Sequence, residues 1–138
     1  MRGGHVLKTW ATTQPTIALS SAEAELIAAV RGAAEGLSAL TLCTDFGREC
    51  SLTVYLDSSA AIGVARRRGV GKIRHLDTRL LWIQERVHAG DLQIVKVAGT
   101  ENPADLMTKH LGEDALGECL SRMNCWPRTG RTAIAPNV

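Results

Sequence analysis

Three acidic side chains stand beside predicted element ends, where they could bind a metal ion. Asp57 follows the strand-like run at 52–56, Glu25 lies in the first turns of a predicted helix, and Asp105 follows the helix start at Asn102. Carboxylates that converge from separate elements, without histidine or thiolate partners of matching spacing, are the ligands that Mg²⁺ or Mn²⁺ prefers. Two such ions can hold the attacking and leaving oxygens of an in-line phosphodiester displacement.

Each carboxylate also has a purely structural interpretation. Glu25 and Asp105 can stabilise the positive end of a helix, because both lie in a first turn or close to it. Asp57 can fix its own turn together with Ser58. The spacing of these residues leaves both interpretations open.

A second chemical feature is a local concentration of positive charge. The net charge is only +2, yet the segment 66–79 holds six Lys or Arg residues and one acid, Asp77. Such a block indicates a polyanionic partner more strongly than the global charge does. The alternative is a solvated loop with a charged helix face.

The elements that must position these residues alternate between strands and helices. We expect strands at 5–11, 52–57 and 92–97, and helices after Ser20, at 60–66, at 73–87 (ending at Gly90), after Asn102 and around 116–123. Ser20 and Glu23 form a capping box for the first helix. The small residues Gly32 and Gly36 predict that another segment packs closely against that helix. The order indicates an α/β fold.

Composition narrows the classes of protein. The 138 residues have room for one domain of ordinary size, and 45% hydrophobic with 22% charged residues is typical of a soluble globular chain. We expect no membrane span and no signal peptide. The four cysteines show no CxxC spacing, so we expect reduced thiols and an intracellular protein, cytoplasmic or nuclear.

Four motifs then carry a family resemblance. They are Ala-Glu-Ala-Glu-Leu at 22–26, Tyr-Leu-Asp-Ser-Ser at 55–59, Lys-Ile-Arg-His-Leu-Asp at 72–77 and Glu-Asn-Pro-Ala-Asp-Leu-Met-Thr-Lys at 101–109. In this order and spacing the chain resembles the C-terminal ribonuclease H domain of copia-type LTR retrotransposon Pol polyproteins, over about 3–111. The combination of motifs is specific, whereas no single one is.

The resemblance implies a fold, an activity and a site. The fold would be a ribonuclease H-like mixed sheet with flanking helices, here without its first strands. The activity would be metal-dependent hydrolysis of the RNA strand of RNA–DNA hybrids. Glu25, Asp57 and Asp105 would be catalytic ligands of Mg²⁺ or Mn²⁺ in a two-metal site. Hybrid phosphates would be held by the basic block, which we assign to Arg66, Arg67, Arg68, Lys72, Arg74 and His75.

The resemblance also implies partners and a departure. The partners would be the hybrid and the reverse transcriptase domain of a parent polyprotein, with no membrane. The first of the family's four carboxylates lies on a strand that would precede 5–11 and has no counterpart here, so we expect an incomplete metal site and impaired cleavage. The alternative is a non-catalytic nucleic-acid-binding remnant or an inactive gene fragment. We expect a partial domain at 1–111, a helical extension at 112–126 and a disordered tail at 127–138.

Overall fold

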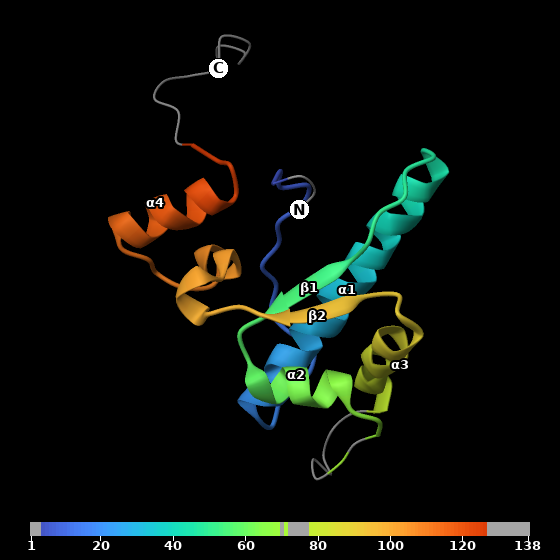
Figure 1. Cartoon of the computed structure of the whole chain (residues 1–138). Helices are drawn as coiled ribbons and strands as arrows, with labels where there is room; N and C mark the ends of the chain where they lie inside the picture. The colour runs from blue at the N-terminus through green and yellow to red at the C-terminus, as the bar shows by residue number, and fades with distance from the viewer. Residues whose placement is uncertain (1–3, 70, 72–77, 127–138) are drawn as a thin grey trace. The chain divides into compact units, whose positions relative to one another are not determined.

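The computed structural model describes residues 4–69, 71 and 78–126, and the chain divides into two compact units. The sheet unit is Thr12–Asn102, and the terminal unit combines Met1–Ala11 with Pro103–Val138. The regular elements of the sheet unit are α1 (Ser21–Asp45), β1 (Thr53–Leu56), α2 (Ser59–Arg66), α3 (Trp82–Ala89), β2 (Gln93–Lys96) and the 3-10 helices Thr78–Leu81 and Gly99–Glu101 (Figure 1). The terminal unit contains the 3-10 helix Pro103–Met107 and α4 (Glu113–Arg122).

Helix α1 begins at the predicted capping box. Ser20 Oγ accepts a hydrogen bond from the Glu23 amide at 3.2 Å, and the Glu23 carboxylate accepts one from the Leu19 amide at 2.8 Å. The close approach predicted at the small residues is found at Gly36, where an added Cβ would lie 2.6 Å from the Leu52 side chain. It is not found at Gly32, which has open space around it. The glycine at 36 therefore lets the segment before β1 pack against the helix.

Strands β1 and β2 pair in parallel, with Leu56 opposite Lys96. The pairing extends through hydrogen bonds from the Gln93 amide to the Leu52 carbonyl, at 2.9 Å, and from the Val97 amide to the Leu56 carbonyl, at 3.0 Å. Parallel neighbours need a long connection, and α2 and α3 lie in that connection. The carboxyl ends of both strands therefore share one edge of the sheet.

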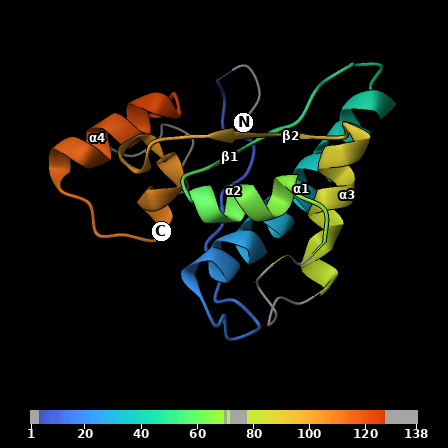
Figure 2. The ribbon, with the colours of Figure 1, turned by 60° about the horizontal axis from the view of Figure 1, so that its bottom comes forward.

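The hydrophobic core lies on one face of this strand pair. Leu56 and Ile94 are buried there in one cluster with Leu26 of α1, and Figure 2 shows α1, α2 and α3 on the same side of the strands. On the opposite face Tyr55 and Val95, which are opposite each other in the register, are 60% and 37% exposed. Within the described residues the sheet has these two strands. The wider ribonuclease H-like mixed sheet stays a prediction.

The strand predicted at 5–11 is wrong for the described part of the chain. His5 is an isolated bridge residue, and residues 6–11 have no regular secondary structure. A strand forms only where a neighbour satisfies its amide and carbonyl groups, so local sequence pattern is insufficient here. Just before this segment, Asn124 Nδ2 donates a hydrogen bond to the Gly4 carbonyl at 2.9 Å, within the terminal unit.

Two predicted helices differ from the structure. Of the helix predicted at 73–87, residues 73–77 lie outside the described residues, and Thr78–Leu81 is a 3-10 turn that leads into α3. Gly90 ends α3 with φ of 81°, as predicted. The α-helix expected after Asn102 is wrong, because Pro103–Met107 is a 3-10 helix of five residues. Helix α4 lies in the predicted extension at 112–126, and the tail at 127–138 is outside the described residues.

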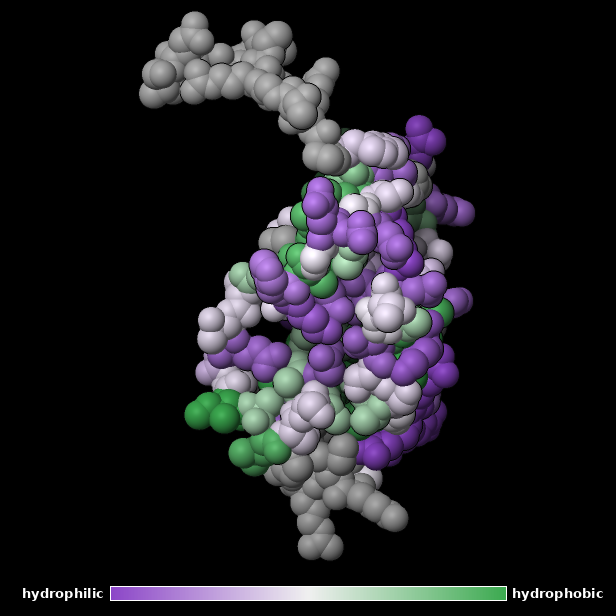
Figure 3. All heavy atoms as spheres, turned by 90° about the vertical axis from the view of Figure 1, so that its left-hand side faces the viewer, coloured by the Kyte–Doolittle hydropathy of each residue, from purple (hydrophilic) through white to green (hydrophobic). Residues whose placement is uncertain are grey.

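Helix α1 has the length and composition of a membrane span. Length and composition alone do not make a membrane span, so the expectation of no membrane span stays a prediction. A core helix of a soluble protein passes the same test, and α1 contributes the buried residues Leu26, Ala29 and Ala33 to the core cluster. Figure 3 shows a face of the molecule on which hydrophilic side chains predominate and hydrophobic ones form separate patches.

Candidate active site and basic segment

Asp57 directly follows β1, at the strand end where open α/β sheets place their ligands. The next residue, Ser58, caps α2, because its Oγ accepts a hydrogen bond from the Ala61 amide at 3.2 Å. Asp57 is half-buried, and an added Cβ on Gly99 would lie 3.7 Å from its Oδ2. Within the described part of the chain its carboxylate makes neither a hydrogen bond nor an ion pair.

Lys96, at the end of β2, fixes the turn that carries Asp57. Its Nζ donates to the Asp57 carbonyl at 2.6 Å and to Ser59 Oγ at 2.7 Å. The sequence analysis did not single out this lysine, because its partners lie 39 and 37 residues earlier. The signal that could have found it is the register, since parallel pairing of the two predicted strands puts Lys96 opposite Leu56.

Glu23 and Glu25 have different environments on α1. Glu23 is 7% exposed, and its carboxylate is bound to the Leu19 amide in the capping box. Glu25 is exposed one half-turn further along the helix. The structural role of Glu23 is thus confirmed, and Glu25 is the one of the two whose carboxylate a solvent ion can reach. Its role as a ligand stays a prediction.

Asp105 belongs to the terminal unit, in the 3-10 helix Pro103–Met107. Its carboxylate forms an ion pair with Lys109 Nζ at 2.9 Å, and its side chain is 19% exposed. Its backbone carbonyl accepts hydrogen bonds from the amides of Thr108, at 3.1 Å, and Lys109, at 2.9 Å. Unlike Asp57, this acid already has a cationic partner, which a metal ion would have to displace.

The three acids assigned to the expected metal site lie on or beside separate elements. Carboxylate oxygens are the donors that Mg²⁺ and Mn²⁺ favour, so the chemistry of Glu25, Asp57 and Asp105 fits such an ion. Among the described residues, no three His, Cys, Asp or Glu side chains come together as a metal-binding group. Glu25 and Asp57 belong to the sheet unit and Asp105 to the terminal unit. The three-ligand arrangement stays a prediction.

The described arginines of the basic block have three different environments. Arg66 Nη2 donates to the Ile94 carbonyl of β2 at 2.6 Å. The Arg67 guanidinium lies against Gly71, where an added Cβ would be 2.6 Å from its Cζ. Arg68 is exposed. Lys72, Arg74 and His75, also predicted to contact nucleic acid, lie outside the described residues.

Gln84 of α3 binds the chain on both sides of these arginines. Its Nε2 donates to the Val64 carbonyl at 2.8 Å and to the Gly69 carbonyl at 3.0 Å, and its Oε1 accepts from the Gly69 amide at 2.8 Å. The side chain is 5% exposed. Sequence reasoning missed this residue, because a glutamine on a charged helix gives no signal of burial. Gln84 therefore holds the end of α2 and the turn at Gly69 together, and we call this set of hydrogen bonds the clamp.

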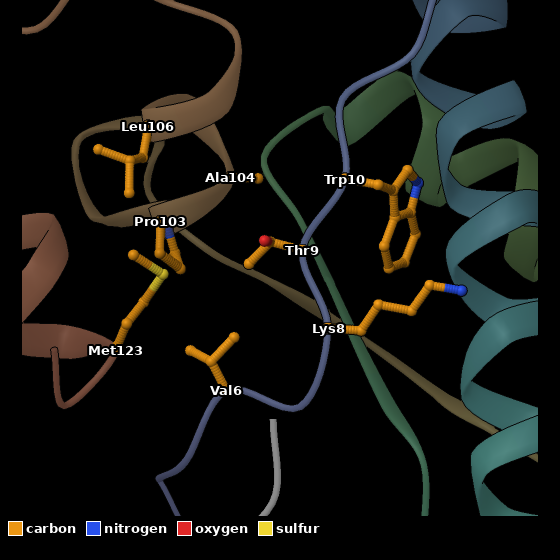
Figure 4. A pocket seen from close by; sticks show the side chains of 8 residues that line it. All are labelled: Val6, Lys8, Thr9, Trp10, Pro103, Ala104, Leu106 and Met123. Atoms are coloured by element: carbon orange, nitrogen blue, oxygen red, sulfur yellow. The ribbon is translucent and has the colours of Figure 1, made fainter. Parts of the chain in front are cut away.

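The terminal unit holds a cavity of about 230 Å³. It is lined by Val6, Lys8, Thr9, Trp10, Pro103, Ala104, Leu106 and Met123 (Figure 4). In this view Val6 and Thr9 point towards Pro103 and Met123, whereas Trp10 and Lys8 point to the other side. The Lys8 ammonium lies 5.5 Å from the centre of the Trp10 ring. Its lining has no carboxylate, so the cavity lacks the oxygen ligands that Mg²⁺ or Mn²⁺ prefers.

Comparison with known proteins relates the chain to a polyprotein. It is 35% identical over 98 residues to the Retrovirus-related Pol polyprotein from transposon TNT 1-94 of Nicotiana tabacum. The match covers 70% of this chain and 7% of that polyprotein, so the chain spans a small part of its length. No family model and no solved structure matches. The similarity supports an origin in a retrotransposon Pol polyprotein.

Proposed function

We propose that the chain is a ribonuclease H-like domain of a retrotransposon Pol polyprotein and that its reaction is hydrolysis of the RNA strand of RNA–DNA hybrids. The observation that carries the proposal is the Asp57 carboxylate, which lies at the carboxyl end of a parallel strand, before a capped helix, and has no partner among the described residues. The Pol relative and the order of the motifs around Glu25, Asp57 and Asp105 support it.

Glu25, Asp57 and Asp105 are the residues that we propose hold Mg²⁺ or Mn²⁺. The bound metal would activate water and stabilise the charge that develops on the phosphate. The chain's own residues position the ligands: Lys96 fixes the backbone turn at Asp57. Asp105 can serve only when its ion pair with Lys109 opens. The turn at Asp57 is already fixed by a hydrogen bond, whereas the Lys109 side chain must move before Asp105 can bind a metal ion.

The basic block would hold the hybrid through its phosphates. Guanidinium contacts to phosphate add affinity without reading sequence, which suits a nuclease that must act along any hybrid. Arg66 and Arg68 are both exposed, but the Arg66 guanidinium donates to the Ile94 carbonyl of the sheet. Lys72, Arg74 and His75 complete the proposed contact.

The partner that we propose in the polyprotein is its reverse transcriptase domain, which makes the hybrid that this domain degrades.

The experiment that tests this function is cleavage of a hybrid labelled on its RNA strand, with Mn²⁺. The chain should release RNA fragments, and the Asp57→Asn variant should release none above background. Asp45→Asn is the matched control, because Asp45 is an exposed aspartate at the other end of α1 from Glu25. Equal cleavage by the chain and by Asp57→Asn would contradict the proposal.

A second candidate is a nucleic-acid-binding remnant without cleavage. The observation that favours it is the ion pair of Asp105 with Lys109, together with the lack of a three-residue metal group among the described side chains. This candidate function predicts that a well-folded chain binds the hybrid in a salt-dependent way but releases no RNA fragments in Mn²⁺. Circular dichroism separates this result from an unfolded gene fragment.

A further inference from the structure

The hydrogen bonds of Gln84 bracket the first basic residues of the segment. One anchor is the Val64 carbonyl in the last turn of α2, and the other is the backbone of Gly69, bound through both its amide and its carbonyl. Four residues, 65–68, lie between the anchors. Because both anchors are backbone groups, the clamp fixes the main chain from which Arg68 extends.

The turn at Gly69 adds a second constraint on the same backbone. Gly69 has φ of 76°, a left-handed conformation that glycine adopts without the penalty a side chain brings. An added Cβ there would meet no atom within 4 Å, so any substitution effect at this position reports backbone conformation and not packing. This allows the turn to be disturbed without touching the core.

We propose that Gln84 is a positioning residue that holds Arg68 for contact with a backbone phosphate of the nucleic acid. The proposal rests on the proposed function, because it assumes that the basic block binds the hybrid. The physical reason is preorganisation: a main chain already fixed in the free protein loses less conformational freedom on binding. Arg68 suits the contact because it is exposed, whereas the guanidinium of Arg66 is used by the Ile94 carbonyl.

The test is binding of the full chain to an RNA–DNA hybrid, without divalent metal, over a series of salt concentrations. The slope of log affinity against log salt counts the phosphates that the protein neutralises, at about 0.9 per phosphate. Loss of folded protein scales the affinity by a factor but leaves this slope unchanged. The slope therefore separates positioning from mere stability.

Arg68→Gln should lower the slope by about 0.9 and weaken binding about five- to tenfold at 0.1 M salt. Gln84→Met, which removes no charge, should lower the slope by a similar amount. Arg48→Gln is the matched control, because Arg48 is an exposed arginine outside the segment. Its slope should equal that of the natural chain.

If Gln84→Met does not fold, variants at Gly69 test the positioning role instead. Gly69→Ala should lower the slope, since alanine is strained at positive φ, and Gly69→Asn should restore it, since asparagine tolerates that conformation. Unchanged slopes in Gln84→Met and Gly69→Ala would overturn the positioning role while leaving the proposed function intact. If the natural chain does not bind the hybrid, or binds it independently of salt, both the positioning role and the proposed hybrid contact are overturned. The cleavage assay with the Asp57→Asn control would then test the nuclease activity separately.

Discussion

Helix α2 is held at both ends by a side chain from a neighbouring element. At its amino end, Lys96 of β2 donates to the Asp57 carbonyl and to Ser59 Oγ. At its carboxyl end, Gln84 of α3 binds Val64 and Gly69. The lysine is exposed and the glutamine is 5% exposed. Both ends of α2 are therefore held by hydrogen bonds from a neighbouring side chain, which is exposed at the amino end and buried at the carboxyl end.

The difference in burial separates stability from chemistry. Removing a buried amide leaves its hydrogen-bond partners unpaired, which costs free energy of folding. Removing an exposed ammonium costs less, because water replaces its hydrogen bonds. The Gln84 end should therefore contribute more to stability. The Lys96 end, beside an open carboxylate, is accessible to solvent ions. We infer that the carboxyl end of α2 is built for rigidity and the amino end for access.

The largest expected effect is at the buried clamp. Gln84→Met keeps the length of the side chain but leaves the Val64 carbonyl without this donor, so the free energy of unfolding should fall by about 2–3 kcal/mol. Urea denaturation measures it, with Gln93→Met as the control at an exposed glutamine. Equal unfolding midpoints for the two variants would remove the distinction between the two ends of α2.

The helix cap at the amino end should have an intermediate effect. Ser58→Ala removes the acceptor of the Ala61 amide, and the loss of such a cap costs about 1 kcal/mol. The same urea measurement applies, and Ser51→Ala, at an exposed serine before β1, is the control. A loss as large as that of Gln84→Met would show that the amino end is as rigidly held as the other.

The smallest expected effect is at Lys96. Lys96→Met should change the free energy of unfolding by no more than about 0.5 kcal/mol, because its two hydrogen bonds are exposed. The variant should nevertheless bind Mn²⁺ more weakly than the natural chain, since the turn that carries Asp57 loses the two hydrogen bonds that fix it. Titration with Mn²⁺ at low salt measures this. Tighter binding would mean that the lysine repels the cation more than it positions Asp57.

Sequence reasoning succeeded where the structure is local. The capping box at Ser20 and Glu23 and the end of α3 at Gly90 depend on neighbouring residues, and both are confirmed. The strands predicted at 52–57 and 92–97 are confirmed as β1 and β2, and Asp57 directly follows the first of them.

Sequence reasoning failed where distant partners decide. The segment at 5–11 has the pattern of a strand but no ladder within the described residues, and the α-helix after Asn102 became a 3-10 helix. Lys96 and Gln84 act on residues 15 to 39 positions away, which no local motif encodes. Of the candidate site, the sequence located single acids beside element ends, and whether they converge depends on tertiary packing, which no local motif encodes.

The central claim is that Asp57 is a metal ligand at the end of β1, and Mn²⁺ binding tests it most directly. Electron paramagnetic resonance counts free Mn²⁺ in a titration of the natural chain, of Asp57→Asn and of the control Asp45→Asn. The account predicts that Asp57→Asn weakens binding at least tenfold, about 1.4 kcal/mol, while Asp45→Asn leaves it unchanged. Equal binding by all three proteins would contradict it.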